Sequence, residues 1–169
     1  MLSPSRSVLL ASVYSGTDPE ELREFFASFA YASLNHLTDL FICIDGPISD
    51  EIVFIISLLE SDSSFEMHVM SNANNLGLAI SLNRMLIASL RLGYSIFYRA
   101  DTDDLLHPHR LLRQYEFLVA NPEVDICGTW YYIVPAYRAI RLPVDNSEIK
   151  KKFSSGLAIA HPTVAFKYS

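Results

Sequence analysis

Apolar runs typical of buried strands alternate four times with segments that carry helix signals, and no other feature of the sequence constrains the fold as much. This alternation predicts an α/β domain: a mostly parallel sheet with right-handed crossovers and helices on both faces. The apolar runs are continuous, which fits a sheet covered on both sides. The expected strands span 7–14, 40–44, 65–70, 94–99 and 124–130, and the expected helices begin after Asp18, begin at Ser49, and span 78–92 and 108–120.

The first helix has the clearest signals. Asp18 is the expected N-cap and Pro19 the first helical residue. The apolar residues that follow recur at helical spacing and predict one stripe facing a core: Leu22, Phe25, Phe26 and Phe29. Gly93 is the expected C-terminal stop of the third helix.

The length, composition and net charge of the chain limit the classes of protein to which it can belong. The chain has 169 residues, 50% of them apolar, which suffices for one domain over residues 1–169. Its net charge of −6 argues against a basic nucleic-acid-binding surface, but a divalent cation would still allow an anionic ligand to bind. No apolar run is long enough to predict a membrane-spanning helix. Cys43 and Cys127 lie in apolar runs and are expected to be buried free thiols of a reducing compartment.

Three carboxylates follow the fourth expected strand within four positions: Asp101, Asp103 and Asp104. Carboxylates this close repel one another, so a positive group should lie among them. Oxygen ligands at a strand end suit Mg²⁺ or Mn²⁺. In the alternative interpretation, Arg99 pairs with Asp101 or Asp103, and Asp104 only caps the next helix.

Polar and aromatic side chains also follow the other expected strands. Tyr14 ends the first, Asp45 follows the second, and Asn74 and Asn75 follow the third. Ligands of open α/β sheets bind beyond the carboxyl ends of the strands, so this set predicts a nucleotide site: a ring for the base, Asp45 for a base or ribose donor, and a cation for a diphosphate. Each residue alone also has a structural explanation, such as a turn at Asp45. Dinucleotide-binding and P-loop glycine motifs are missing from the sequence.

With these motifs the chain resembles the family 2 glycosyltransferases of the GT-A fold. The resemblance runs through most of the chain, in segments 12–14, 44–46, 75–79, 82–83, 99–104 with Pro108 and Arg110, 121–128 and 161–164. The segment 99–104 is similar to the family's metal-binding D-x-D motif.

The resemblance implies a site and a reaction. It places Asp101 near the ribose or base. It makes Asp103 the metal ligand, with Asp101 as a second ligand. The implied donor-binding residues are Ser12, Tyr14, Asp45, Asn75, Gly77, Asn83, Arg99 and Asp101. The implied activity is metal-dependent, inverting transfer of a sugar from a nucleoside-diphosphate sugar, most simply a UDP-sugar, to a saccharide or lipid-linked acceptor in surface polysaccharide synthesis. A cytoplasmic location is expected, with a peripheral contact to the inner membrane face or a homo-oligomer contact left open.

One departure concerns the catalytic base. The family's acceptor side carries a Glu-Asp pair, and no such pair follows Asp104. We therefore expect the chain to be the donor-binding part, with the acceptor part missing, and we expect exposed apolar surface along the fifth strand and the C-terminal strand. The base is unknown, and Asp104 is the weak candidate. His161 is either a site residue or a packed strand residue, and His107 and His109 are expected to be exposed helix-start residues. Two alternatives stay open: a non-catalytic nucleotide-sugar-binding module, and a sugar nucleotidyltransferase, for which the loop after Tyr14 lacks the required glycine-rich basic sequence.

Overall fold

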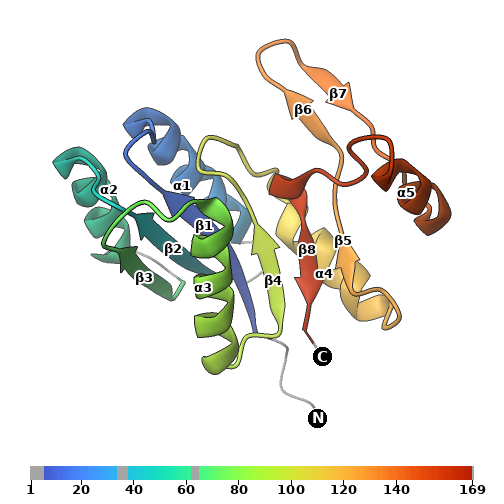
Figure 1. Ribbon diagram of the computed structural model, residues 1–169, viewed down its shortest axis with the longest axis horizontal. Coiled ribbons are helices and arrows are strands. Elements are labelled where there is room, and N and C mark those ends of the chain that lie inside the picture. The colour runs from blue at the N-terminus through green and yellow to red at the C-terminus, as the bar shows by residue number, and fades with distance from the viewer. Residues whose placement is uncertain (1–5, 34–37, 62–64, 169) are drawn as a thin grey trace.

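The computed structural model describes residues 6–33, 38–61 and 65–168, and its elements follow the predicted alternation up to the fourth helix (Figure 1). The strands are β1 (Ser7–Val13), β2 (Asp39–Asp45), β3 (Met67–Asn72), β4 (Ile96–Arg99), β5 (Ile126–Cys127), β6 (Tyr131–Ile133), β7 (Arg138–Ile140) and β8 (Ala165–Lys167). The helices are α1 (Pro19–Ser33), α2 (Asp50–Ser61), α3 (Leu78–Arg91), α4 (Arg110–Ala120) and α5 (Asn146–Phe153), with a 3₁₀ turn at His161–Thr163.

Six of the strands form one mixed sheet in the order β3-β2-β1-β4-β8-β5. The pairs β1–β2, β2–β3 and β1–β4 are parallel, as the alternation predicts. β8 pairs antiparallel with β4 on one side and with β5 on the other. The α/β class with a mostly parallel sheet is therefore confirmed, and β8 is the antiparallel strand within it.

Helices cover both faces of this sheet, because successive side chains of a strand point to opposite faces. On one face, Leu9 and Ala11 of β1 pack with the apolar stripes of α1, α2 and α4. On the other face, Val8 and Leu10 pack with Met85 of α3. Figure 1 shows α3 in front of the strands, with α1, α2 and α4 behind them and α5 at the side.

The helix ends follow the predicted chemistry. The Asp18 carboxylate accepts hydrogen bonds from the backbone N–H groups of Glu20 at 2.8 Å and Glu21 at 3.2 Å, which confirms it as the cap of α1. Gly93 follows α3 with a φ of +85°, a conformation that glycine adopts without strain.

One prediction about the C-terminal third is wrong, and a second holds for only one of its two strands. The expected strand 124–130 is reduced to Ile126–Cys127, because its only sheet partner in the described chain is the short β8. We also expected exposed apolar surface along both the fifth strand and the C-terminal strand. Ile126 is indeed 49% exposed, but Ala165 of β8 is fully buried because its side chain belongs to the main apolar core.

Both cysteines are free thiols, Cys43 buried and Cys127 partly buried. Among the described residues, no helix combines the length and the apolar character needed to cross a membrane.

Candidate functional site

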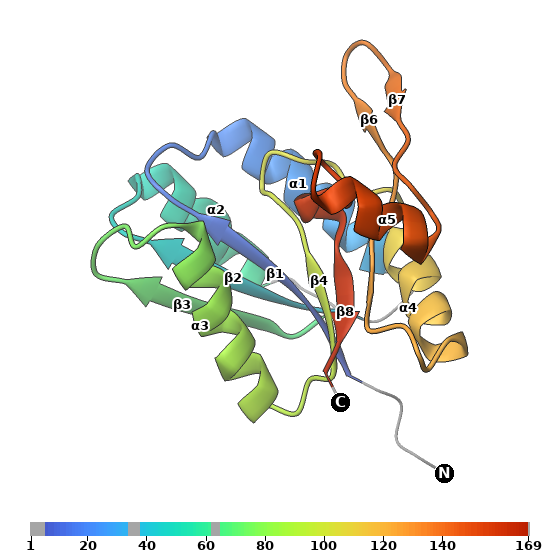
Figure 2. The ribbon, with the colours of Figure 1, turned by 45° about the vertical axis from the view of Figure 1, so that its right-hand side comes forward.

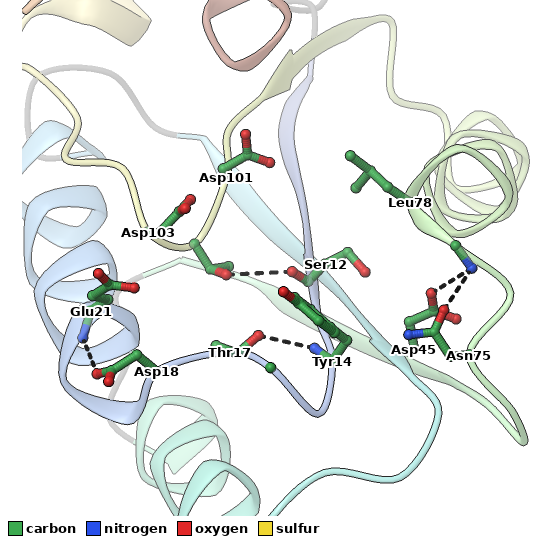
Figure 3. A pocket seen from close by; sticks show the side chains of 13 residues that line it. Ser12, Tyr14, Thr17, Asp18, Glu21, Asp45, Asn75, Leu78, Asp101 and Asp103 are labelled. Atoms are coloured by element: carbon green, nitrogen blue, oxygen red, sulfur yellow. Dashed lines mark hydrogen bonds between the residues drawn. The ribbon is translucent and has the colours of Figure 1, made fainter. Parts of the chain in front are cut away.

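A pocket of about 420 Å³ lies at the carboxyl ends of β1, β2 and β4, where the starts of α1 and α3 complete its wall (Figure 3). It brings together residues from four separate segments of the chain. The lining residues are Ser12, Tyr14, Gly16, Thr17, Asp18, Glu21, Asp45, Asn75, Gly77, Leu78, Asp101, Thr102 and Asp103. The sequence predicted that these strand ends would meet, and they do.

Tyr14 forms one wall of the pocket. Its backbone N–H donates to the Thr17 hydroxyl at 3.0 Å, and the Thr17 N–H donates back to the Tyr14 carbonyl at 3.0 Å, which closes a tight turn. The Tyr14 side chain is 49% exposed. A Cβ on Gly16 would lie 2.6 Å from the Tyr14 ring, so this ring position depends on a glycine there. The ring face is thus held over the turn and is open on the side of the pocket.

Ser12 connects β1 to its neighbours. Its hydroxyl donates to the Cys43 carbonyl of β2 at 3.2 Å, and its own carbonyl accepts from the Thr102 hydroxyl at 3.4 Å. Thr102 is buried and lies between two acidic residues of the motif. These bonds fix the acidic loop against the end of β1.

Asp45 is buried and holds the loop that precedes α3. Its carboxylate accepts from the backbone N–H groups of Leu76 at 2.8 Å and Gly77 at 2.9 Å, and from the Asn72 amide at 2.7 Å. Burial raises the pKa of Asp45, but these three donors outweigh burial and leave the pKa below its ordinary value. The carboxylate is therefore ionised, and it orders the part of the wall that contains Asn75.

A buried polar group behind Asp45 was missed from the sequence. The Asn72 amide donates to both Asp45 and the Ser81 hydroxyl, and the Arg84 guanidinium donates to the Asn72 side-chain oxygen. The predicted third strand stopped at Met70, whereas β3 continues to Asn72, which pairs in register with Asp45. A strand-end polar residue opposite Asp45 was the available signal.

Two predicted donor-binding residues do not line the pocket. Asn83 lies in the second turn of α3 with an exposed side chain, while Ser81 is the polar residue on the buried side of that turn. Arg99 is 4% exposed, and its guanidinium makes two hydrogen bonds to the Asp101 carboxylate, one of them 2.7 Å long. The alternative interpretation of Arg99, as the ion-pair partner of Asp101, is the observed one.

A second arginine, which is partly buried, lies close to the acidic motif. The Arg110 guanidinium donates to the Arg99 carbonyl at 2.7 Å and to the Gln114 side chain at 3.0 Å. Burial lowers the pKa of Arg110 to about 10, and the nearby Asp104 acts in the opposite direction. The acidic motif thus has positively charged arginines next to it, in addition to any cation bound from the pocket side.

The acidic residues lie close enough to bind one cation. Asp101, Asp103 and Asp104 each have a carboxylate oxygen within 4.8 Å of the others, and Asp103 is exposed at the pocket. Partial burial and the charges of Asp103 and Asp101 raise the pKa of Asp104. Asp104 is not among the lining residues, so the structure places Asp101 and Asp103, not Asp104, at the cavity.

Three histidines, His107, His109 and His161, lie at the surface. His161 is an exposed residue of the 3₁₀ turn before β8 and is not a strand residue. Partial burial and the Arg99 charge lower the pKa of His161, with Asp101 acting in the opposite direction. His107 and His109 are exposed residues just before α4, as predicted.

Comparisons with known proteins bear on the family of the chain. A family model described as glycosyl transferase family 2 matches residues 12–166. A protein of Haemophilus influenzae described as an uncharacterized glycosyltransferase is 28% identical over 168 residues, which cover 95% of this chain and 60% of the relative. The amylovoran biosynthesis glycosyltransferase AmsE of Erwinia amylovora is 26% identical over 162 residues, covering 94% and 59%. The chain thus spans about 60% of the length of these relatives.

Solved structures share the fold. TarS of S. aureus superimposes with a TM-score of 0.67 at 14% identity, over 96% of this chain and 28% of TarS. The mannosyltransferase PcManGT of Pyrobaculum calidifontis, solved with GDP-Man and Mn²⁺, gives 0.67 at 13% identity, over 98% and 45%. A TarS fragment spanning 1–349, solved with UDP-GlcNAc, gives 0.65 at 14% identity, over 96% and 45%.

The mixed sheet with helices on both faces has the GT-A fold, which the solved structures share. Because the family model matches nearly the whole chain, the chain belongs to glycosyl transferase family 2.

Proposed function

We propose that this chain binds a nucleoside-diphosphate sugar in the pocket at its strand ends and forms the donor part of an inverting, metal-dependent glycosyltransferase. The observation that carries the proposal is the meeting of Tyr14, Asp101 and Asp103 around one pocket of about 420 Å³. An aromatic ring, ordered backbone and carboxylates are the groups that a base, a ribose and a metal-bound diphosphate require.

The proposal assigns each part of the donor to residues that line the pocket. The exposed face of Tyr14 offers a stacking surface for the base. Asn75 lies in the loop that Asp45 orders, and its side-chain oxygen accepts from the Gly77 N–H at 3.0 Å, so its side-chain NH₂ is the group it offers to the base or ribose. Asp101, fixed by Arg99, presents a carboxylate edge to a ribose hydroxyl. The diphosphate then lies toward Asp103.

A divalent cation fits the residues at this end of the pocket. Carboxylate oxygens are the ligands that Mg²⁺ and Mn²⁺ prefer, and three of them lie within 4.8 Å of one another. Arg99 already occupies one edge of Asp101, so Asp103 is the main ligand and Asp101 the second. When bound, such a cation neutralises the negative charge of the departing diphosphate.

The transfer places further demands on the site. In an inverting reaction the acceptor hydroxyl attacks the anomeric carbon from the side opposite the diphosphate, and a carboxylate removes its proton. We assign no base: Asp104 lies next to the metal motif and outside the lining of the pocket. We propose a saccharide or lipid-linked acceptor in surface polysaccharide synthesis, supported by the name of the amylovoran relative.

UDP-sugar is the proposed donor. TarS has been solved with UDP and with UDP-GlcNAc, and PcManGT with GDP-Man, so related folds take both nucleotides. The membership in glycosyl transferase family 2 supports the transferase over a sugar nucleotidyltransferase, which remains the third choice after a binding module without turnover.

Calorimetric titration of UDP and GDP in the presence of Mn²⁺, Mg²⁺ or a chelator tests the proposal. We expect UDP to bind at least tenfold more tightly with Mn²⁺ than with the chelator, and Asp103→Ala to abolish this difference. Asp104→Ala should weaken binding less. Asp125→Asn, an exposed acidic residue outside the pocket, is the matched control and should bind UDP like the parent protein.

Equal UDP affinity with and without the cation in the parent protein would refute the metal assignment. Metal-dependent release of sugar from a panel of nucleotide-sugars would separate the enzyme from the binding module, because the module binds without turnover. Release of pyrophosphate from a nucleoside triphosphate and a sugar phosphate would instead identify a nucleotidyltransferase.

A further inference from the structure

The β6–β7 hairpin and α5 project from the sheet as a separate surface. Both ribbon views show the hairpin standing out from the end of the domain, with α5 beside its base (Figures 1 and 2). Among the described residues, β6 and β7 pair only with each other. We name this region the hairpin–α5 surface, residues 130–157.

This surface has the opposite charge to the rest of the chain. Residues 130–157 contain five basic and two acidic side chains, while the chain as a whole has a net charge of −6. The basic residues are Arg138, Arg141, Lys150, Lys151 and Lys152, and all five are exposed. Within the described parts of the chain, none of them makes a salt bridge. The charge is therefore not neutralised by neighbouring acids.

Large apolar and aromatic side chains are exposed among these cations. Tyr137 is 76% exposed and Tyr132 68%, both on the hairpin, and Phe153 at the end of α5 is 65% exposed. Val134 and Val144 are exposed as well. The Arg141 guanidinium lies over the ring of Trp130, 5.3 Å from the ring centre, so a cation and an indole ring are in contact on this surface. An apolar area this dense at a projecting tip indicates an interaction site.

An apolar hollow adjoins this surface. It has a volume of about 620 Å³ and lies between α4 and the segment that leads into α5, where Trp130, Val144 and Ile149 contribute to its lining. The exposed apolar side chains thus continue from the hairpin base to the first turns of α5.

Lysines beside exposed tyrosines are the combination that binds the surface of an anionic bilayer. The cations are attracted to acidic headgroups, while amphipathic aromatic rings enter the headgroup layer. The sign of the charge selects anionic lipid, and the projecting hairpin lets its side chains reach the headgroups while the acidic remainder stays away from them. We propose that the hairpin–α5 surface binds the chain peripherally to membranes that contain anionic lipid. This goes beyond nucleotide-sugar binding and does not depend on it.

Co-sedimentation with vesicles tests the proposal on the protein as it stands. One set of vesicles contains equal parts of phosphatidylglycerol and phosphatidylcholine, and the other contains phosphatidylcholine alone. We expect sedimentation with the anionic vesicles only, decreasing as salt screens the charges. Lys151→Gln with Lys152→Gln should lower the vesicle partition coefficient about tenfold. Tyr132→Ser with Tyr137→Ser should also lower it, which simple charge attraction would not predict.

Arg23→Gln with Arg91→Gln is the matched control, because it removes the same charge from exposed residues of α1 and α3. It should sediment like the parent protein. No binding to anionic vesicles, or equal loss in the lysine variant and the control, would overturn the proposal. If the partner of this surface were instead an acidic protein or a second copy of the chain, the protein would not bind the anionic vesicles. Calorimetric binding of UDP to the same variants is independent of the vesicle result, so the two proposals fail separately.

Discussion

The carboxylate of Asp45 at the end of β2 accepts a hydrogen bond from the backbone N–H of Gly77, 32 positions further along the chain, over 2.9 Å. Gly77 has a φ of +87° and starts α3, so this bond fixes where the helix begins relative to the sheet. Asp45 was predicted to contact the nucleotide. In the structure its carboxylate is occupied by backbone and amide donors, and it shapes the wall that the nucleotide would meet.

Asp45→Asn should therefore weaken both the fold and the site. An amide cannot accept hydrogen bonds with its nitrogen, so at least one buried donor loses its partner. We expect a loss of about 1–3 kcal/mol in the free energy of unfolding, measured by urea denaturation, and weaker UDP binding. Asp18→Asn is the control, since it lines the same pocket and asparagine caps a helix as well as aspartate does. Equal stability of the Asp45→Asn variant and the parent would contradict the assignment.

The same carboxylate predicts a pH dependence. The pKa of Asp45 in the folded protein is below its unfolded value, so its contribution is present above about pH 4 and is lost as the pH falls through the folded pKa. The free energy of unfolding should therefore decrease more steeply below about pH 4 in the parent than in Asp45→Asn. Urea denaturation at a series of acidic pH values measures both slopes, and identical slopes would refute the prediction.

Arg99 and Asp101 should respond unequally to mutation. The Arg99 side chain is 5% exposed, whereas that of Asp101 is 34% exposed. Asp101→Asn leaves a buried guanidinium without its counter-ion and should cost about 2–4 kcal/mol of unfolding free energy. Arg99→Met leaves a carboxylate that water can reach, so it should cost less. Urea denaturation measures the free energy of unfolding of both variants. A larger loss in Arg99→Met than in Asp101→Asn would contradict this prediction.

Gly16→Ala should affect binding more than stability. The new methyl group would lie 2.6 Å from the Tyr14 ring, an exposed side chain that can swing away. Displacing the ring removes the proposed stacking surface, so we expect UDP to bind several-fold more weakly, about 1 kcal/mol, with an unchanged melting temperature. Ser15→Ala, at the neighbouring exposed position, should leave both quantities unchanged. Undiminished UDP affinity in Gly16→Ala would exclude Tyr14 from the base site.

The parallel part of the fold was predictable because continuous apolar runs and capped amphipathic helices are local signals. Asp18 and the phenylalanine stripe of α1 placed the first helix correctly. The position of β8 was not predictable, because a strand of three residues carries almost no pattern and its place depends on the partners it finds. For the same reason the predicted fifth strand was longer than the observed one.

The site was predictable in its location and less so in its internal contacts. Tyr14, Asp45 and Asp101 meet because parallel strands end at one edge of a sheet. The pairing of Arg99 with Asp101 is local, and it was one of the two interpretations that the sequence left open. The role of Asn72, by contrast, depends on which side chains face each other across the sheet. That information is not contained in the spacing of residues along one segment.

The insertion of β8 has a consequence for synthesis on the ribosome. β1 to β4 can pair with one another once residue 99 has emerged, but β5 finds its hydrogen-bond partner only when Ala165 and Phe166 follow it, about forty residues later. Until then Ile126 and its neighbours form a hydrophobic edge on a nascent chain. Chaperone binding during translation should therefore concentrate on the interval between these two strands.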